Sequence, residues 1–234
     1  MQQEQKLTRK VSITEKLSKF ILSIRFVLWV ILAVLFGGLL FYFIYTEITG
    51  RIREDSTVLV EKAEKLQSEW IKQEAGEQKQ KLEEKLVADL DSIIKAYPNQ
   101  YAGQRALFIR GNMYMNRKEW QQAAESFMTL KKSFPRSYLA TEALFKTGVC
   151  QEELNEPEKA IASYTELTEK FKSSPRIPHA YFSIARLNEQ KESYEEAVRI
   201  YNLLKLDYSY SYWTNLGINR IIELKSEGKI SEQQ

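Results

Sequence analysis

Residues 120–135 read WQQAAESFMTLKKSFP, and this stretch decides the fold. At helical spacing, one face carries a small residue, Ala123, followed by the large residues Phe127, Leu130 and Phe134. An isolated amphipathic helix usually builds its apolar stripe from bulky aliphatic residues, because these bury the most area. A small residue followed by an aromatic one instead predicts that a neighbouring helix approaches closely at the alanine and packs around the ring.

The same face returns twice further along the chain, each time after 37 residues. It reappears as Ala160, Tyr164, Leu167 and Phe171, and then as Ala197, Tyr201, Leu204 and Tyr208. The segment before each copy keeps the same offset in three columns: Ala106, Ala143 and Ala180; Leu107, Leu144 and Tyr181; Gly111, Gly148 and Ala185. Two helices therefore repeat together, which predicts an all-α solenoid of helix hairpins.

The organisation expected from this repeat has five parts. They are a basic tail over 1–25, a transmembrane helix over 26–46, a helical stalk or the first helix of a degenerate repeat over 47–77, the solenoid over 78–211, and a capping helix with a disordered tail over 212–234. The stripe expected on the stalk is Leu59, Ala63, Leu66 and Trp70. A cap is needed because an end repeat would otherwise expose its apolar face.

The membrane segment is predicted from an uncharged run, FVLWVILAVLFGGLLFYFIY, at residues 26–45. As a helix it is about 30 Å long, the thickness of a bilayer core. A cleaved signal peptide would have an apolar core of about 7–15 residues and would end in small residues, whereas this run is longer and ends in bulky aromatics. The lone Cys150 is far from the run, so a lipid anchor has no attachment point.

Charge predicts the orientation of that helix. Residues 1–25 carry six basic and two acidic side chains, whereas the remaining 28 basic and 29 acidic side chains give −1. By the positive-inside rule, the N-terminus is expected in the cytoplasm of a single-pass inner-membrane protein, with the C-terminal domain in the periplasm. The nearly neutral C-terminal part argues against nucleic acid as a partner.

The first repeat copy resembles the tetratricopeptide repeat. It has the expected residues at repeat positions 4, 8, 11, 20, 24, 27 and 32, namely Leu107, Gly111, Tyr114, Ala123, Phe127, Leu130 and Pro135. The later copies lose the tyrosine to Gln151 and Asn188. The 37-residue period and the layout resemble bacterial envelope members of the YfgM, CpoB and BamD types. This resemblance implies a scaffold that binds other envelope proteins, by recruiting a client or chaperone or by assembling an envelope complex.

The resemblance also implies a concave binding groove lined by the first helix of each pair. Its candidate residues are Arg105, Phe108, Asn112, Met115 and Asn116 in the first copy, Glu142, Phe145, Val149, Glu152 and Glu153 in the second, and His179, Phe182, Arg186, Glu189 and Gln190 in the third. Three phenylalanines share one repeat position in this set. They predict either an apolar rail for a partner's segment or rings that pack against the next repeat, and the sequence leaves both open.

Catalysis is not expected from these residues. His179 is the only histidine, so no histidine and cysteine cluster can bind zinc. The acidic pairs Glu152-Glu153 and Glu195-Glu196 lie on charged helix faces, and no glycine-rich phosphate loop occurs. We therefore expect no enzyme activity, no metal and no cofactor. Cys150 is expected to pack as a small buried residue.

Two functions remain open from the sequence. The first is a membrane-anchored scaffold that recruits exported proteins through the concave face. The alternative is a structural subunit of a large periplasmic assembly, such as a flagellar-motor collar in a spirochaete-type envelope. Self-association through Gly37 and Gly38 would fit a fixed assembly, although the flanking residues form no small-xxx-small pattern.

Overall fold

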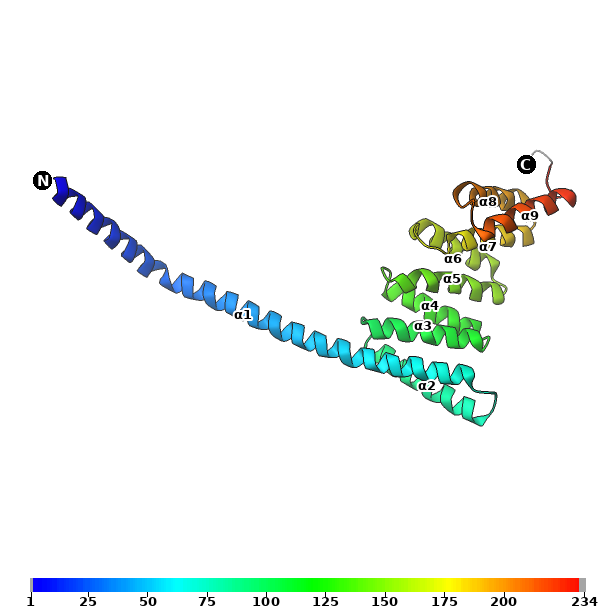
Figure 1. The fold of residues 1–234 in the computed structure, drawn as a ribbon, viewed down its shortest axis with the longest axis horizontal. Helices are drawn as coiled ribbons and strands as arrows, with labels where there is room; N and C mark the ends of the chain where they lie inside the picture. The colour runs from blue at the N-terminus through cyan, green and yellow to red at the C-terminus, as the bar shows by residue number, and fades with distance from the viewer. Residues whose placement is uncertain (1, 232–234) are drawn as a thin grey trace. The chain divides into compact units, whose positions relative to one another are not determined.

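The computed structural model describes residues 2–231, with side chains over 15–27 and 29–231, and every regular element in that range is an α-helix (Figure 1). The helices are α1 (Gln2–Lys72), α2 (Glu77–Ala96), α3 (Tyr101–Asn116), α4 (Trp120–Ser133), α5 (Tyr138–Glu153), α6 (Pro157–Lys170), α7 (Ile177–Gln190), α8 (Tyr194–Asp207) and α9 (Tyr212–Ser226). The all-helical prediction is confirmed. The chain divides into a unit ending at Glu54 and a unit beginning at Asp55.

The first unit contains α1 up to residue 54, and most of the apolar side chains described there are exposed. Phe26, Phe36 and Phe41 are exposed by 75%, 67% and 71%. Such a surface is unfavourable in water and favourable in a hydrocarbon layer. Among the described residues, one helix, located near the N-terminus, is long and apolar enough to cross a membrane by its length and composition.

The second unit is a stack of helix hairpins, in which each helix from α2 onward packs against the next one in the chain (Figure 1). Two repeat positions hold alanine in all three copies, and all six side chains are fully buried: Ala106, Ala143 and Ala180 on the first helices, and Ala123, Ala160 and Ala197 on the second helices. A Cβ atom added to Gly111 or Gly148 would lie 2.6 or 2.5 Å from the ring of Phe127 or Tyr164. The small columns therefore exist because the aromatic ring of the second helix occupies the space beside the first helix.

The turn inside each full hairpin uses one residue in the left-handed conformation. Lys118, Asn155 and Glu192 have φ angles of 59°, 56° and 58°, and they are 37 residues apart. Asparagine tolerates this conformation well, whereas lysine and glutamate adopt it less readily. The turn at Asn155 could therefore be predicted from the residue type. The turns at Lys118 and Glu192 could be predicted only from the 37-residue offset.

A serine lies at or just before the start of α5, α7 and α9, again at the 37-residue offset, and it caps α5 and α9. The Oγ atoms of Ser137, Ser174 and Ser211 accept hydrogen bonds from the backbone N–H two residues later, at 2.9, 3.1 and 3.2 Å. Such bonds satisfy amide groups that have no partner within the helix. These serines fix where each new repeat begins.

The part of α1 after residue 54 packs as a hairpin with α2. Val60, Ala63, Leu66 and Trp70 join one core with α2 and α3. Leu59, which we expected in this stripe, is 39% exposed, so that assignment is wrong. The buried line passes through Val60 instead, because α3 lies against that side of α1.

The C-terminal end of the array is closed by α9, which packs on α7 and α8. Beyond it, Ile230 is only 9% exposed and contacts the core residues Val198 and Leu224. The expectation of a disordered tail directly after α9 is therefore wrong for residues 228–230, because an apolar side chain there covers the end of α8. Residues 232–234 of that expectation lie outside the described residues.

Candidate protein-binding face

The candidate groove residues all lie on the first helices of the hairpins, namely on α3, α5 and α7. These helices form one face of the array, since α3 contacts α5 and α7 contacts α9 directly. Asn112, Met115, Val149 and Glu152 are partly buried there, while Asn116, Glu153 and Gln190 are exposed. The positions alone do not show which side chains a partner could reach. The contacts of the residues at each repeat position show which of them are accessible.

The phenylalanine column packs between successive repeats and does not form a continuous exposed rail. Phe145 is only 5% exposed, with its ring centroid 4.5 Å from that of His179 and 5.4 Å from that of Tyr164. Phe108 and Phe182 are half-buried against the rings of Phe127 and Tyr201. The rail hypothesis is therefore wrong for Phe145, because α7 lies directly over it.

An aromatic stack joins α5, α7 and α9. His179 lies flat on Trp213, with ring centroids 3.6 Å apart and an interplanar angle of 9°, and Phe145 flanks its other side. Trp213 also contacts the ring of Phe182 at 5.4 Å. Sequence reasoning did not assign Trp213 to this face. The signal available was an aromatic pair, Tyr212 and Trp213, at the start of the capping helix.

His179 is held neutral by this environment. Burial, together with the nearby Arg176 and Arg186, lowers the pKa to about 4, whereas Glu142 acts in the opposite direction. Desolvation and like charge both disfavour the imidazolium form. At neutral pH the ring is therefore an uncharged packing group, and it belongs to the interface between repeats.

The carboxylates of this face are used between repeats as well. Glu152 accepts a hydrogen bond from the hydroxyl of Tyr164 at 2.7 Å and pairs with Arg186 of the next first helix. Glu189 accepts one from Tyr201 at 2.6 Å, and Arg220 Nε donates to it at 3.2 Å. The glutamates and tyrosines are each 37 residues apart, so this is one motif that occurs twice.

Further ion pairs join other first helices in the same way. Arg176 donates two hydrogen bonds to Glu142, at 2.6 and 2.8 Å, and Arg105 pairs with Glu64. Partly buried, bidentate pairs of this kind fix geometry more than isolated surface pairs do. Several charged residues of the candidate groove, among them Glu142, Glu152 and Glu189, therefore hold neighbouring repeats together.

The buried tyrosines are hydrogen-bond donors in this motif. Burial and the neighbouring carboxylate raise the pKa of Tyr164 and of Tyr201, so both phenols keep their protons. In the first copy, Met115 and Phe127 stand where the later copies have glutamate and tyrosine. The polar motif therefore begins only at α5, and the N-terminal part of the face is apolar at that position.

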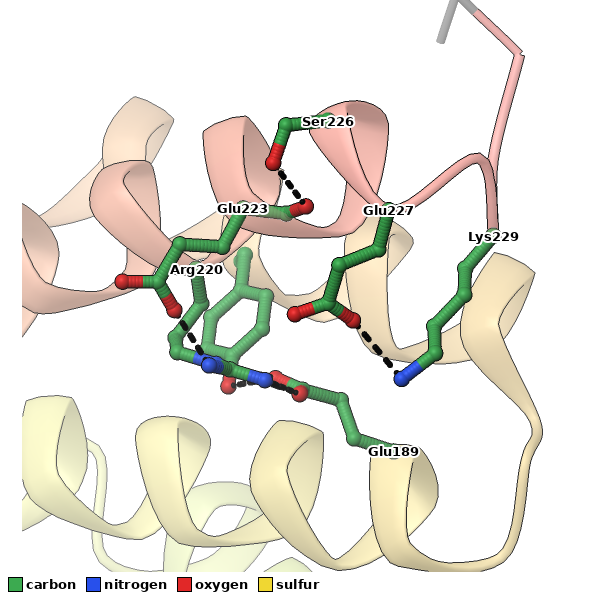
Figure 2. A network of polar contacts seen from close by, with 7 residues as sticks. Glu189, Arg220, Glu223, Ser226, Glu227 and Lys229 are labelled. Carbon is green, nitrogen blue, oxygen red and sulfur yellow. Dashed lines mark hydrogen bonds and ion pairs between the residues drawn. The ribbon is translucent and has the colours of Figure 1, made fainter.

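One open pocket of about 430 Å³ remains at the C-terminal end of this face. It is lined by Phe182, Arg186, Glu189, Gln190, Tyr194, Arg220 and Lys229. Figure 2 shows Arg220 between Glu189 and Glu223, and Lys229 beside Glu227 at 2.7 Å. The Glu189 side chain is only 8% exposed, and the cations that line the pocket, Arg186, Arg220 and Lys229, are each paired with a carboxylate.

Potential metal ligands do not gather in the described part of the chain. No set of three or more His, Cys, Asp or Glu side chains there is placed to hold a metal ion. Cys150 is buried, and desolvation raises the pKa of its thiol to about 11. A protonated, inaccessible thiol is a packing group rather than a nucleophile.

Paired helices of this geometry, stacked with a constant residue offset, define an α-solenoid repeat protein. The family model described as "Tetratricopeptide repeat" matches residues 105–137 and 142–174. These two segments match a family whose members are typically non-enzymatic scaffolds for protein–protein interaction, and the hairpin array is consistent with that superfamily. No curated protein matches the chain.

Proposed function

We propose that this protein is a membrane-anchored scaffold that presents its repeat array in the periplasm and binds a segment of another envelope protein. In this proposal residues 1–25 are a cytoplasmic tail and residues 26–46 cross the inner membrane. The array then follows outside the membrane. Its division into a stalk or degenerate first repeat, a solenoid and a cap is part of the same proposal.

The observation that carries the proposal is the surface of α1 before residue 54. The most apolar window of this helix has none of its residues buried inside the protein. Aromatic residues lie at both ends of the uncharged run, Phe26 and Trp29 at one end and Tyr42 and Tyr45 at the other, as expected at membrane interfaces. The basic tail supports the proposed orientation, and the resemblance to YfgM-type envelope proteins supports the proposed compartment.

The orientation can be tested by cysteine labelling in cells. Ser18 and Ser209 are both exposed, whereas the native Cys150 is buried and gives a low background. In spheroplasts, we expect a membrane-impermeant maleimide to label Ser209→Cys and to label Ser18→Cys only after lysis. The parent protein, with Cys150 alone, is the control. Labelling of Ser18→Cys before lysis, or protection of Ser209→Cys, would contradict the proposed topology.

The binding face can be tested with a photoreactive residue at the rim of the open pocket. Gln190 is exposed there, and Asn202, exposed on the second helix of the same hairpin, is a matched control outside the pocket. We expect defined crosslinks from position 190 that are absent from position 202. We also expect Arg220→Glu to weaken them about tenfold, because it removes a cation from the pocket. Equal crosslinking from both positions would rule out this face.

A further inference from the structure

A second open groove, of about 440 Å³, lies between α1 and α2 at the N-terminal end of the array. Its apolar lining comes from Leu59, Leu66 and Ile93. The charged lining is Lys62, Lys65 and Glu69 of α1 with Lys85 and Asp89 of α2. It is separate from the pocket between α7 and α9, with which it shares no residue.

The next hairpin shows what covers this position inside the array. Arg110 of α3 donates to Ser126 of α4 at 3.2 Å and pairs with Asp91 of α2 at 2.6 Å. Ser126 is 1% exposed, because Arg110 and its neighbours close the space between α3 and α4. Asp89, 37 residues before Ser126, stands at the same repeat position but is exposed. Gln73 stands 37 residues before Arg110, so the first hairpin has no arginine that closes the space beside Asp89, and the groove stays open.

The lysines of the groove are used differently from the arginines of the next hairpin. Arg105, Arg110 and Arg117 are each held by a carboxylate of a neighbouring helix. Within the part of the chain that the structure describes, no carboxylate forms an ion pair with Lys62, Lys65 or Lys85. Three free ammonium groups on the rims face two carboxylates, which leaves an excess of positive charge around an apolar floor.

We propose that this groove binds an amphipathic helix of a second protein, whose apolar stripe is flanked by carboxylates. The stripe lies on Leu59, Leu66 and Ile93, as in other helix-in-groove complexes. The flanking carboxylates pair with Lys62 and Lys65 on one rim and with Lys85 on the other. The bound helix thereby extends the stack by one element and covers the repeat position that is open in the chain alone.

The test uses the full chain in detergent micelles and two fluorescent, covalently stapled helical peptides of about 16 residues. Both peptides carry the same leucine stripe, and it is flanked by glutamates in one and by lysines in the other. Fluorescence anisotropy measures their affinities. We expect the acidic peptide to bind at least about tenfold more tightly than the basic one, and Lys62→Glu/Lys85→Glu to weaken its binding by about tenfold or more.

The matched control is Lys172→Glu/Lys205→Glu, which makes the same change of charge at exposed lysines away from the groove. This variant should bind the acidic peptide as the parent does. Circular dichroism should show the same helix content for all three proteins, since every substituted lysine is exposed. The proposal is overturned if the acidic peptide does not bind, if the basic peptide binds equally well, or if the two double variants bind alike.

Discussion

Replacing Tyr164 by alanine is expected to lower the free energy of unfolding of the repeat array by about 4 kcal/mol. The side chain is fully buried, and its ring fills the space beside Gly148 in which a Cβ atom would lie 2.5 Å away. It also contacts the ring of Phe145 at 5.4 Å. Truncation therefore opens a cavity between α5 and α6 that the paired helices cannot close. Urea denaturation of the full chain in detergent, followed by circular dichroism, measures the loss.

Two variants separate the ring from its hydroxyl. Tyr164→Phe keeps the packing and is expected to cost only about 1 kcal/mol, since Glu152 loses one hydrogen bond but keeps its pair with Arg186. Tyr164→Phe/Glu152→Met reproduces the pair found in the first copy, Phe127 with Met115, but it also leaves Arg186 without its carboxylate and should be less stable than Tyr164→Phe. If the alanine variant were no less stable than the phenylalanine variant, the ring would not be holding the hairpin together.

Acidification from about pH 7 to about pH 4.5 is expected to destabilise the array by up to about 2 kcal/mol through His179. The folded-state pKa is about 4, below the ordinary value of 6.5. Between these values the unfolded chain binds the proton that the folded chain excludes. The stabilising contribution is therefore fully present above pH 6.5 and is lost as the pH falls toward 4. The ring is only half-buried, so solvent screens its charge and keeps the effect below that expected for a fully buried histidine.

The control for this effect is His179→Phe, which keeps an aromatic ring between Phe145 and Trp213 but cannot bind a proton. The difference in unfolding free energy between parent and variant, measured at both pH values, removes the contribution of the carboxylates that titrate in the same range. On acidification, we expect the parent to lose more unfolding free energy than the variant does. An unchanged difference would mean that His179 titrates alike in the folded and unfolded chains.

Much of the fold was predictable because small and large residues recur at fixed positions in each repeat. Alanine and glycine columns facing aromatic ones, in phase over 37 residues, require two helices per unit that approach closely, and the fully buried Ala106 and Ala123 confirm this. The uncharged run at 26–45 likewise follows from composition alone. The prediction from spacing fails at the N-terminal end of the array. Leu59 matches the expected stripe by spacing, but α3 packs against another side of α1, so Leu59 is partly exposed.

The candidate binding face was less predictable, because its contacts join residues of different repeats. Phe145 is covered by His179, 34 residues later, and Glu189 is held by Arg220, 31 residues later. A family pattern assigns both residues to the concave side, but it does not tell whether the next helix leaves them accessible. The pocket beside α9 depends on Lys229, which lies in the segment we expected to be disordered.

The sequence by itself determined that this chain forms helix pairs, how many residues each pair takes, and where an apolar helix precedes them. These properties depend on spacing within one helix or at one fixed offset. Only the tertiary structure decided which side chains remain accessible, since that depends on how each first helix lies over the one before it. Packing of α7 on α5 buries Phe145. No helix of the second unit covers the outer side of α1 and α2, and there the groove lined by Lys62 and Lys85 stays open.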